Sequence, residues 1–130
     1  MIIVDSSVWI DYFNGQSTIQ TDRLRSLLGI EFVAIGDVIL TEVLQGFRKD
    51  ADFTQARTRL LSLSIFGMLG VDHALRSAEC YRELRRRGVT IRKTTDVIIA
   101  SYCLTEGHTL LFSDKDFLPF VEYFGLCSAT

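Results

Sequence analysis

The chain has 130 residues, of which 48% are hydrophobic and 23% are charged. This length suits one ordinary domain, and this composition can fill a core, which excludes a disordered chain. The formal net charge is -2, from 14 Lys and Arg against 16 Asp and Glu. That balance argues against a simple basic nucleic-acid binder, because phosphate binding needs concentrated positive charge.

The cysteines and the apolar runs indicate the compartment. Cys80, Cys103 and Cys127 are far apart and form no CxxC or Cys/His zinc pattern. Each lies among apolar residues, so we expect small core side chains in a reducing cytosol. The N-terminus lacks the pattern of a signal peptide, and no stretch reaches the roughly 18 apolar residues of a membrane span. We therefore expect a cytoplasmic protein with no membrane segment.

Short apolar runs alternate with segments of helical period along the chain. Because these runs are continuous, they predict strands that are buried on both faces, as in parallel sheets. The predicted strands are residues 2–4, 32–35, 65–71 and 109–112. The predicted helices are residues 6–13, 18–28, 37–48, 51–64, 72–87, 94–106 and 115–124, with Asp72 as a helix N-cap and a break or bend near Pro119. The alternation indicates right-handed βαβ units in a doubly wound α/β sandwich.

Ligands of such folds bind beyond the carboxyl ends of the strands, and acidic residues lie there. Asp5 ends the first predicted strand, and Asp114 and Asp116 follow the last one. Asp96 lies in the first turn of a predicted helix, and Glu42 lies beside the apolar face of another. Acids that meet in one pocket repel one another and raise one another's pKa values unless a cation compensates them. Mg²⁺ and Mn²⁺ prefer oxygen ligands, and such a site promotes attack of water on a phosphodiester.

Each acid also has a structural interpretation. Asp5 and Asp114 are favoured helix N-cap residues, and Asp116 suits a cap or a first helical turn. Asp96 in a first turn complements a helix dipole, and Glu42 could pair with Arg48 or lie on a solvated edge. The residues alone leave both interpretations open.

Four segments that contain these acids follow one another along the chain: "IIVDSSVWIDYF", "LTEVLQGF", "TTDVIIASYC" and "LLFSDKDF". Their order and spacing, over nearly the whole chain, resemble those of the motifs of PIN-domain ribonucleases, most closely the VapC toxins of bacterial toxin–antitoxin pairs. The resemblance implies one PIN domain over residues 1–130, a three-layer α/β sandwich with a central, mainly parallel sheet. It implies a metal-dependent endoribonuclease, active with Mg²⁺ or Mn²⁺ on an RNA substrate.

The resemblance also implies site residues and partners. Carried over position by position, Asp5, Glu42, Asp96 and Asp114 are the catalytic acids, and they hold the metal together with Asp116. The neighbouring hydroxyls of Ser6, Thr95 and Ser113 could orient these ligands or bound water. A VapB-like antitoxin that covers the acid pocket and a homodimer are the implied protein partners. Exposed aromatic side chains of residues 6–13 would suit an antitoxin helix, although plain core packing is the simpler explanation for at least two of Trp9, Tyr12 and Phe13.

The segment "RELRRRGVTIRK" concentrates positive charge directly before Asp96. It contains Arg82, Arg85, Arg86, Arg87, Arg92 and Lys93. The segment could form a basic rim that binds phosphates, or simply a solvated helix end that favours cations. His73 and His108 have no partner at ligand spacing, so we assign neither a catalytic role.

Rival functions remain at this stage. A phosphatase with Asp5 as nucleophile would have a second Asp two residues later, where this chain has Ser7. A phosphorylated receiver domain would need an acid pair before the strand end and a Lys on a later strand, and neither is evident. A non-catalytic PIN-like interaction module would keep the fold and the antitoxin contact without cleaving RNA.

Overall fold

Four parallel strands form the centre of the computed structural model, which describes residues 1–30 and 32–129. Their order is β3-β2-β1-β4, with β1 at Ile2–Val4, β2 at Val33–Gly36, β3 at Ser64–Phe66 and β4 at Thr109–Leu111. Ile3 aligns with Ala34 on one side and with Leu110 on the other. All three side chains are fully buried, as strands covered on both faces require.

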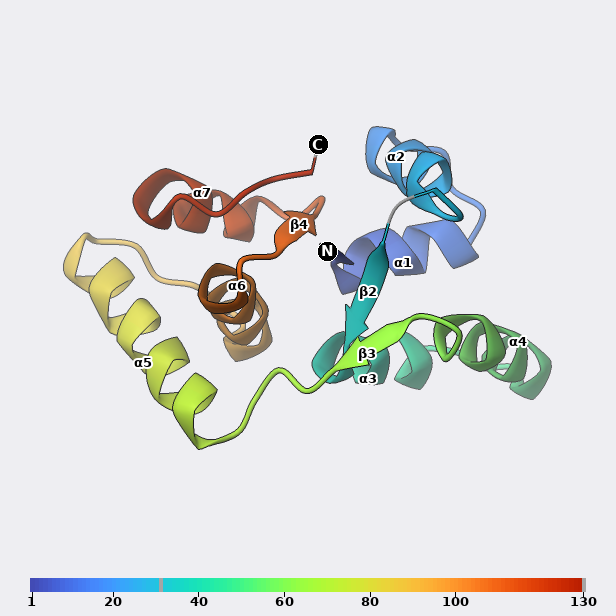
Figure 1. Ribbon diagram of the computed structural model, residues 1–130, viewed down its shortest axis with the longest axis horizontal. Helices are drawn as coiled ribbons and strands as arrows, with labels where there is room; N and C mark the ends of the chain where they lie inside the picture. The colour runs from blue at the N-terminus through green and yellow to red at the C-terminus, as the bar shows by residue number, and fades with distance from the viewer. Residues whose placement is uncertain (31, 130) are drawn as a thin grey trace.

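Helices cover the sheet on two sides. The helices are α1 Ser6–Phe13, α2 Ile19–Leu27, α3 Asp37–Gln45, α4 Asp50–Leu60, α5 Val71–Arg86, α6 Thr94–Glu106 and α7 Leu118–Phe124, with a 3₁₀ turn η1 at Lys115–Phe117. Strands β1 to β3 advance in one direction across the sheet, and the step from β3 to β4 runs the other way. Right-handed crossovers therefore place α1–α4 opposite α5 and α6. Figure 1 shows α1 and α2 on one side of the strands and α5 and α6 on the other. The predicted three-layer α/β class is confirmed.

The third predicted strand is wrong in its extent and its burial. The apolar run at 65–71 contains Gly67 and Gly70, and β3 ends before them at Phe66. Gly70, with φ 104°, occupies the N-cap position of α5, so Asp72 lies in the first turn and is not the cap. Because β3 is an edge strand, Ile65 is 42% exposed.

Other boundaries differ for local reasons. Helix α3 ends at Gln45 and not at residue 48, because Gly46 follows. Helix α4 runs from Asp50 to Leu60, so the prediction of residues 51–64 was too long. The break in the last predicted helix lies between η1 and α7, and Pro119 falls in the first turn of α7, where its missing N–H needs no partner.

The C-terminal segment pairs with the outer edge of β4. The backbone N–H of Leu110 donates to the Cys127 carbonyl at 2.9 Å, and the Ala129 N–H donates to the Leu110 carbonyl at 3.0 Å. These bonds protect one edge of the sheet. Cys127 is exposed in this segment and Cys80 is half-buried, so only Cys103 is the buried core residue that the sequence predicted for all three.

Candidate metal and nuclease site

Asp5 lies at the carboxyl end of β1, deep in the molecule. Its N–H donates to the Leu111 carbonyl at 2.8 Å, so the residue continues the pairing of β1 with β4. Its Oδ2 accepts hydrogen bonds from the Ser7 N–H at 3.4 Å and the Ser7 hydroxyl at 2.8 Å. Asp5 is therefore the N-cap of α1, and its side chain is only 4% exposed. The cap role and a place in the acid pocket are both compatible with this position.

Two hydroxyl groups from different helices hold the carboxylate of Glu42. The Ser6 hydroxyl of α1 donates to Glu42 Oε1 at 2.7 Å. The Thr95 hydroxyl of α6 donates to Glu42 Oε2 at 3.3 Å. Glu42 is therefore joined to the residues that flank Asp5 and Asp96, and not to Arg48.

Asp96 is a buried carboxyl in the first turn of α6. It is 5% exposed, and its Oδ2 has no hydrogen-bond partner among the described residues. The pKa of Asp96 is raised to about 7, chiefly by burial and further by the negative charges of Asp5, Asp114 and Glu42, whereas the charge of Lys93 lowers it. Oδ2 of Asp96 thus lacks both solvent and a hydrogen-bond donor among the described residues.

The residues after β4 complete the acidic group. Asp114 is the N-cap of η1, and its Oδ1 accepts a hydrogen bond from the Asp116 N–H at 2.9 Å. Asp96, Asp114 and Asp116 each place one carboxylate oxygen within 4.8 Å of the others. We call these three residues, with Asp5 and Glu42, the acid cluster. Asp116 Oδ2 also accepts two hydrogen bonds from the Arg92 guanidinium.

The acid cluster fits a hard divalent cation. Burial raises the pKa of Asp5, the hydrogen bonds from Ser7 lower it, and the charge of Glu42 raises it further. Oxygen atoms of several carboxylates converge there, and Asp96 Oδ2 is an unpaired buried acceptor. Oxygen ligands of this kind are those that Mg²⁺ and Mn²⁺ prefer, and a cation would relieve the repulsion. Asp96, Asp114 and Asp116 could reach one ion together.

The hydroxyl contacts were predicted in part. Ser6 and Thr95, which the sequence marked as neighbours of the acids, both contact Glu42. Ser113 is exposed and makes no hydrogen bond to an acid among the described residues. The sequence reasoning missed the Ser7–Asp5 bond, although a Ser two residues after an N-cap Asp is a local signal for it.

The two histidines lie outside the acid cluster and contact other residues. His73 Nε2 is 3.2 Å from Glu106 Oε1, and the His108 ring stacks on Phe66 and Tyr102. Burial lowers the pKa of His108. Neither histidine contacts the acid cluster.

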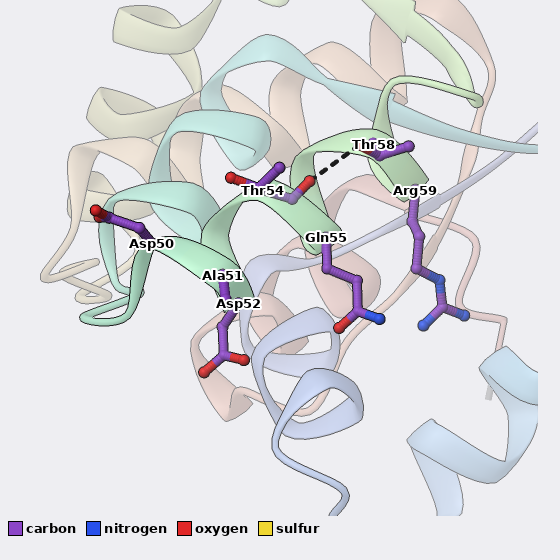
Figure 2. A pocket seen from close by; sticks show the side chains of 7 residues that line it. All are labelled: Asp50, Ala51, Asp52, Thr54, Gln55, Thr58 and Arg59. Atoms are coloured by element: carbon purple, nitrogen blue, oxygen red, sulfur yellow. Dashed lines mark hydrogen bonds between the residues drawn. The ribbon is translucent and has the colours of Figure 1, made fainter.

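Two surface hollows lie away from the acid cluster. A broad one of about 730 Å³ runs along α4, where Asp52, Gln55 and Arg59 project on one side of the helix (Figure 2). A smaller one of about 230 Å³ lies between α1, α2 and the end of α4, with Trp9, Tyr12 and Phe13 in its wall. Trp9 is 2% exposed and belongs to the core, whereas Tyr12 and Phe13 are half-buried.

Comparisons with known proteins agree with this fold. The sequence model of the PIN domain matches residues 2–120. The chain therefore belongs to the PIN-domain family, as its motifs predicted. It is 32% identical over 122 residues to Ribonuclease VapC11 of Mycobacterium tuberculosis and equally to a VapC ribonuclease of Mycobacterium bovis, covering 90% of this chain and 89% of each relative.

Solved structures share the fold at lower identity. VapBC2 of Rickettsia felis, crystallised with a DNA fragment from its promoter, matches with a TM-score of 0.77 and 22% identity over 98% of this chain and 97% of that one. FitAcB of Neisseria gonorrhoeae matches with a TM-score of 0.76 and 16% identity over 98% of this chain and 96% of that one.

Within the described residues, no helix is long and apolar enough to cross a membrane.

Proposed function

We propose that this protein is a metal-dependent endoribonuclease, the toxin of a type II toxin–antitoxin pair, with residues 1–130 acting as one domain. One observation carries the proposal: Asp96 Oδ2 is buried without a hydrogen-bond partner among the described residues, and Asp96 has a carboxylate oxygen within 4.8 Å of oxygens of Asp114 and Asp116. The relatives named VapC ribonucleases, which match over nearly the whole chain, support RNA as the substrate.

The acids have separate tasks in this proposal. Asp5, Glu42, Asp96 and Asp114 are the catalytic acids and hold Mg²⁺ or Mn²⁺. Asp116 is the remaining candidate ligand within reach of the ion, and its Oδ2 is bound to Arg92. The hydroxyls of Ser6 and Thr95 each bind one oxygen of the Glu42 carboxylate and so fix its orientation. A bound ion of this type supplies Lewis-acid chemistry for attack of water on a phosphodiester. Because this chemistry needs no side-chain nucleophile, Ser7 in place of a second Asp is no obstacle.

Cleavage of total cellular RNA by the purified protein tests the proposal. We expect cutting with Mg²⁺ or Mn²⁺, no cutting in EDTA, and none by Asp96→Ala with either metal. Full activity in EDTA, or full activity of Asp96→Ala, would contradict it. A metal-binding wild type that cuts no RNA would favour the non-catalytic interaction module instead.

A VapB-like antitoxin is the proposed protein partner. The hollow between α1, α2 and α4 has an aromatic wall, and Arg59 lies over the Tyr12 ring with its Nη2 2.7 Å from the Tyr12 hydroxyl. Such a surface suits the apolar side of a partner helix. We expect co-expression with the product of a small neighbouring open reading frame to yield a complex without ribonuclease activity. Tyr12→Ala should weaken that complex, and an unchanged affinity would place the antitoxin elsewhere.

A cytoplasmic homodimer completes the proposal. Leu69, just before α5, and Val71 and Leu75, in its first turns, are 48%, 78% and 60% exposed. Leu69 also lines a hollow of about 460 Å³ together with Val97 and Ile98. Exposed apolar side chains grouped in this way are typical of protein interfaces. Light scattering should give twice the chain mass for the wild type and a lower mass for Val71→Asp/Leu75→Asp.

The free, unpaired cysteines agree with a reducing compartment such as the cytoplasm.

A further inference from the structure

The cations of the basic segment have different partners in the structure. Arg85 lies 5.5 Å from the centre of the Tyr81 ring, and Arg87 lies 5.1 Å from that of Tyr123. Arg86 and Arg87 pair with Glu83 at 2.9 and 3.4 Å. These contacts are local or point toward α7. The segment is therefore not one uniform basic rim.

Arg92 alone among the described residues forms an ion pair with a member of the acid cluster. Its Nε and Nη2 each donate to Asp116 Oδ2 at 3.3 Å. The Asp116 N–H is in turn bound to Asp114 Oδ1. The guanidinium is thus held beside the carboxylates of Asp96 and Asp114.

The outer edge of this guanidinium remains available. Only the Nε–Nη2 edge contacts Asp116, and Nη1 has no partner among the described residues. The Arg92 side chain is 77% exposed, whereas that of Asp116 is 24% exposed. An arginine anchored on one edge can still bind a phosphate through two N–H groups on the other.

We propose that Arg92 binds a phosphate of the RNA substrate next to the metal site, and that Asp116 is its positioning residue. The acid cluster repels an approaching phosphodiester, so a cation at its margin lowers that barrier and orients the strand. Arg92 forms an ion pair at this margin, and Lys93 adds a second positive charge near Asp96. This inference rests on the proposed function. It assigns Arg92 to substrate binding and Asp116 to positioning Arg92.

RNA binding measured without cleavage tests the role of Arg92. The probe is a fluorescein-labelled single-stranded oligoribonucleotide of mixed sequence, with Ca²⁺ in place of Mg²⁺, followed by anisotropy over a range of salt concentrations. Arg92→Ala should raise Kd about tenfold and reduce the slope of log Kobs against log salt by about 0.7, the contribution of one phosphate on a single strand. Arg92→Lys should restore the slope but not the whole affinity, because an ammonium group lacks the planar fork.

Arg86→Ala is the matched control, because it removes the same charge from an exposed arginine that pairs with an acid outside the cluster. Its slope should equal that of the wild type. An unchanged slope for Arg92→Ala, or an equal loss for Arg86→Ala, would overturn the assignment of Arg92.

The role of Asp116 is separated from metal binding by two variants. Asp116→Ala should weaken RNA binding, and the double variant with Arg92→Ala should bind no worse than Arg92→Ala, because both changes act on one contact. Asp116→Asn keeps an acceptor oxygen and should recover part of the affinity. Calorimetric Mn²⁺ affinity should stay within about threefold of wild type in both variants, well short of the loss expected from a removed ligand. A large loss of Mn²⁺ affinity would make Asp116 a metal ligand and overturn its positioning role.

The two proposals fail in different ways. A wild type that neither binds the oligoribonucleotide nor cuts RNA contradicts the proposed function. A wild type that does both, with Arg92→Ala unchanged, contradicts only the inference about Arg92.

Discussion

The Ser6 hydroxyl donates a 2.7 Å hydrogen bond to Glu42 Oε1 and so joins the first turn of α1 to α3. Thr95 makes the equivalent contact from α6 to the other oxygen, at 3.3 Å. Each hydroxyl residue is the immediate neighbour in sequence of a buried acid, Asp5 or Asp96. Glu42 is therefore bound to the sequence neighbours of both Asp5 and Asp96, and its carboxylate is oriented without any ligand.

Loss of the Ser6 hydroxyl should weaken metal binding. Ser6→Ala frees one oxygen of Glu42, and partners that orient metal ligands typically contribute 10–100-fold to affinity. We expect calorimetry to show a Mn²⁺ affinity about tenfold lower.

Thr41→Ala is the control for this change. Thr41 precedes Glu42, but its hydroxyl donates to the Asp37 carbonyl within α3. Its Mn²⁺ affinity should equal that of the wild type. If Ser6→Ala binds Mn²⁺ as tightly as Thr41→Ala does, Glu42 is not oriented by Ser6 for this purpose.

Asp5→Asn should separate catalysis from stability. Asn is as good an N-cap as Asp, so α1 keeps its first turn, and the change removes one buried negative charge. We expect the cleavage rate to fall by orders of magnitude, while the melting temperature in EDTA stays equal or rises. A clear fall of the melting temperature would mean that the Asp5 charge serves the fold.

Much of this arrangement follows from the sequence, because strand ends fix where their next residues lie. Asp5 and Asp114 could be placed at one sheet edge since β1 and β4 are parallel and adjacent. The residues alone could not place Glu42, because a helix face does not reveal which hydroxyls from α1 and α6 will meet it. The Arg92–Asp116 pair joins residues 24 positions apart, with α6 and β4 between them, and no local pattern predicts it.

The stability of the metal-free protein should fall as pH rises. The pKa of Asp96 is about 7 in the folded protein, against an ordinary value of 3.8. Between these values the folded state binds more protons than the unfolded state, so the free energy of unfolding decreases with pH. The change should lie between about pH 4 and about pH 7 and level off above that window. Urea unfolding in EDTA at a series of pH values measures it.

Asp96→Asn should flatten this dependence, because the amide does not titrate. Mn²⁺ affinity of the wild type should change in the opposite sense and increase with pH up to about 7, since the ion competes with the proton. A wild type whose stability increases with pH in EDTA across this window would contradict the assigned burial of Asp96.

Gly36 is constrained by packing at the end of β2. A Cβ at this position would overlap the Met68 side chain, which is fully buried. Gly36→Ala should lower the free energy of unfolding by about 1–3 kcal/mol, the usual effect of overpacking. The double variant Gly36→Ala/Met68→Ala should be less destabilised than the sum of its two single changes, and additive effects in urea unfolding would rule out this contact as the cause.

The fold boundaries that the sequence missed have a common physical origin. The run at 65–71 has the hydrophobicity of a buried strand, yet Met68 is its one fully buried residue, packed against Gly36 from a loop. A hydrophobic run indicates that a segment contacts the core, but it does not determine whether the backbone is a strand or a loop. Glycines at 67 and 70 were the local signal against a continuous strand.

The most direct test of the account is the rate of RNA cleavage as a function of Mn²⁺ concentration, measured for the wild type and for Asp96→Asn in EDTA-treated protein. We expect the wild-type rate to rise from background to saturation at the Mn²⁺ concentration that calorimetry gives for binding, and the Asp96→Asn rate to stay at background throughout. A wild-type rate independent of Mn²⁺, or an Asp96→Asn rate that saturates at the wild-type value, would contradict a metal-dependent nuclease at the acid cluster.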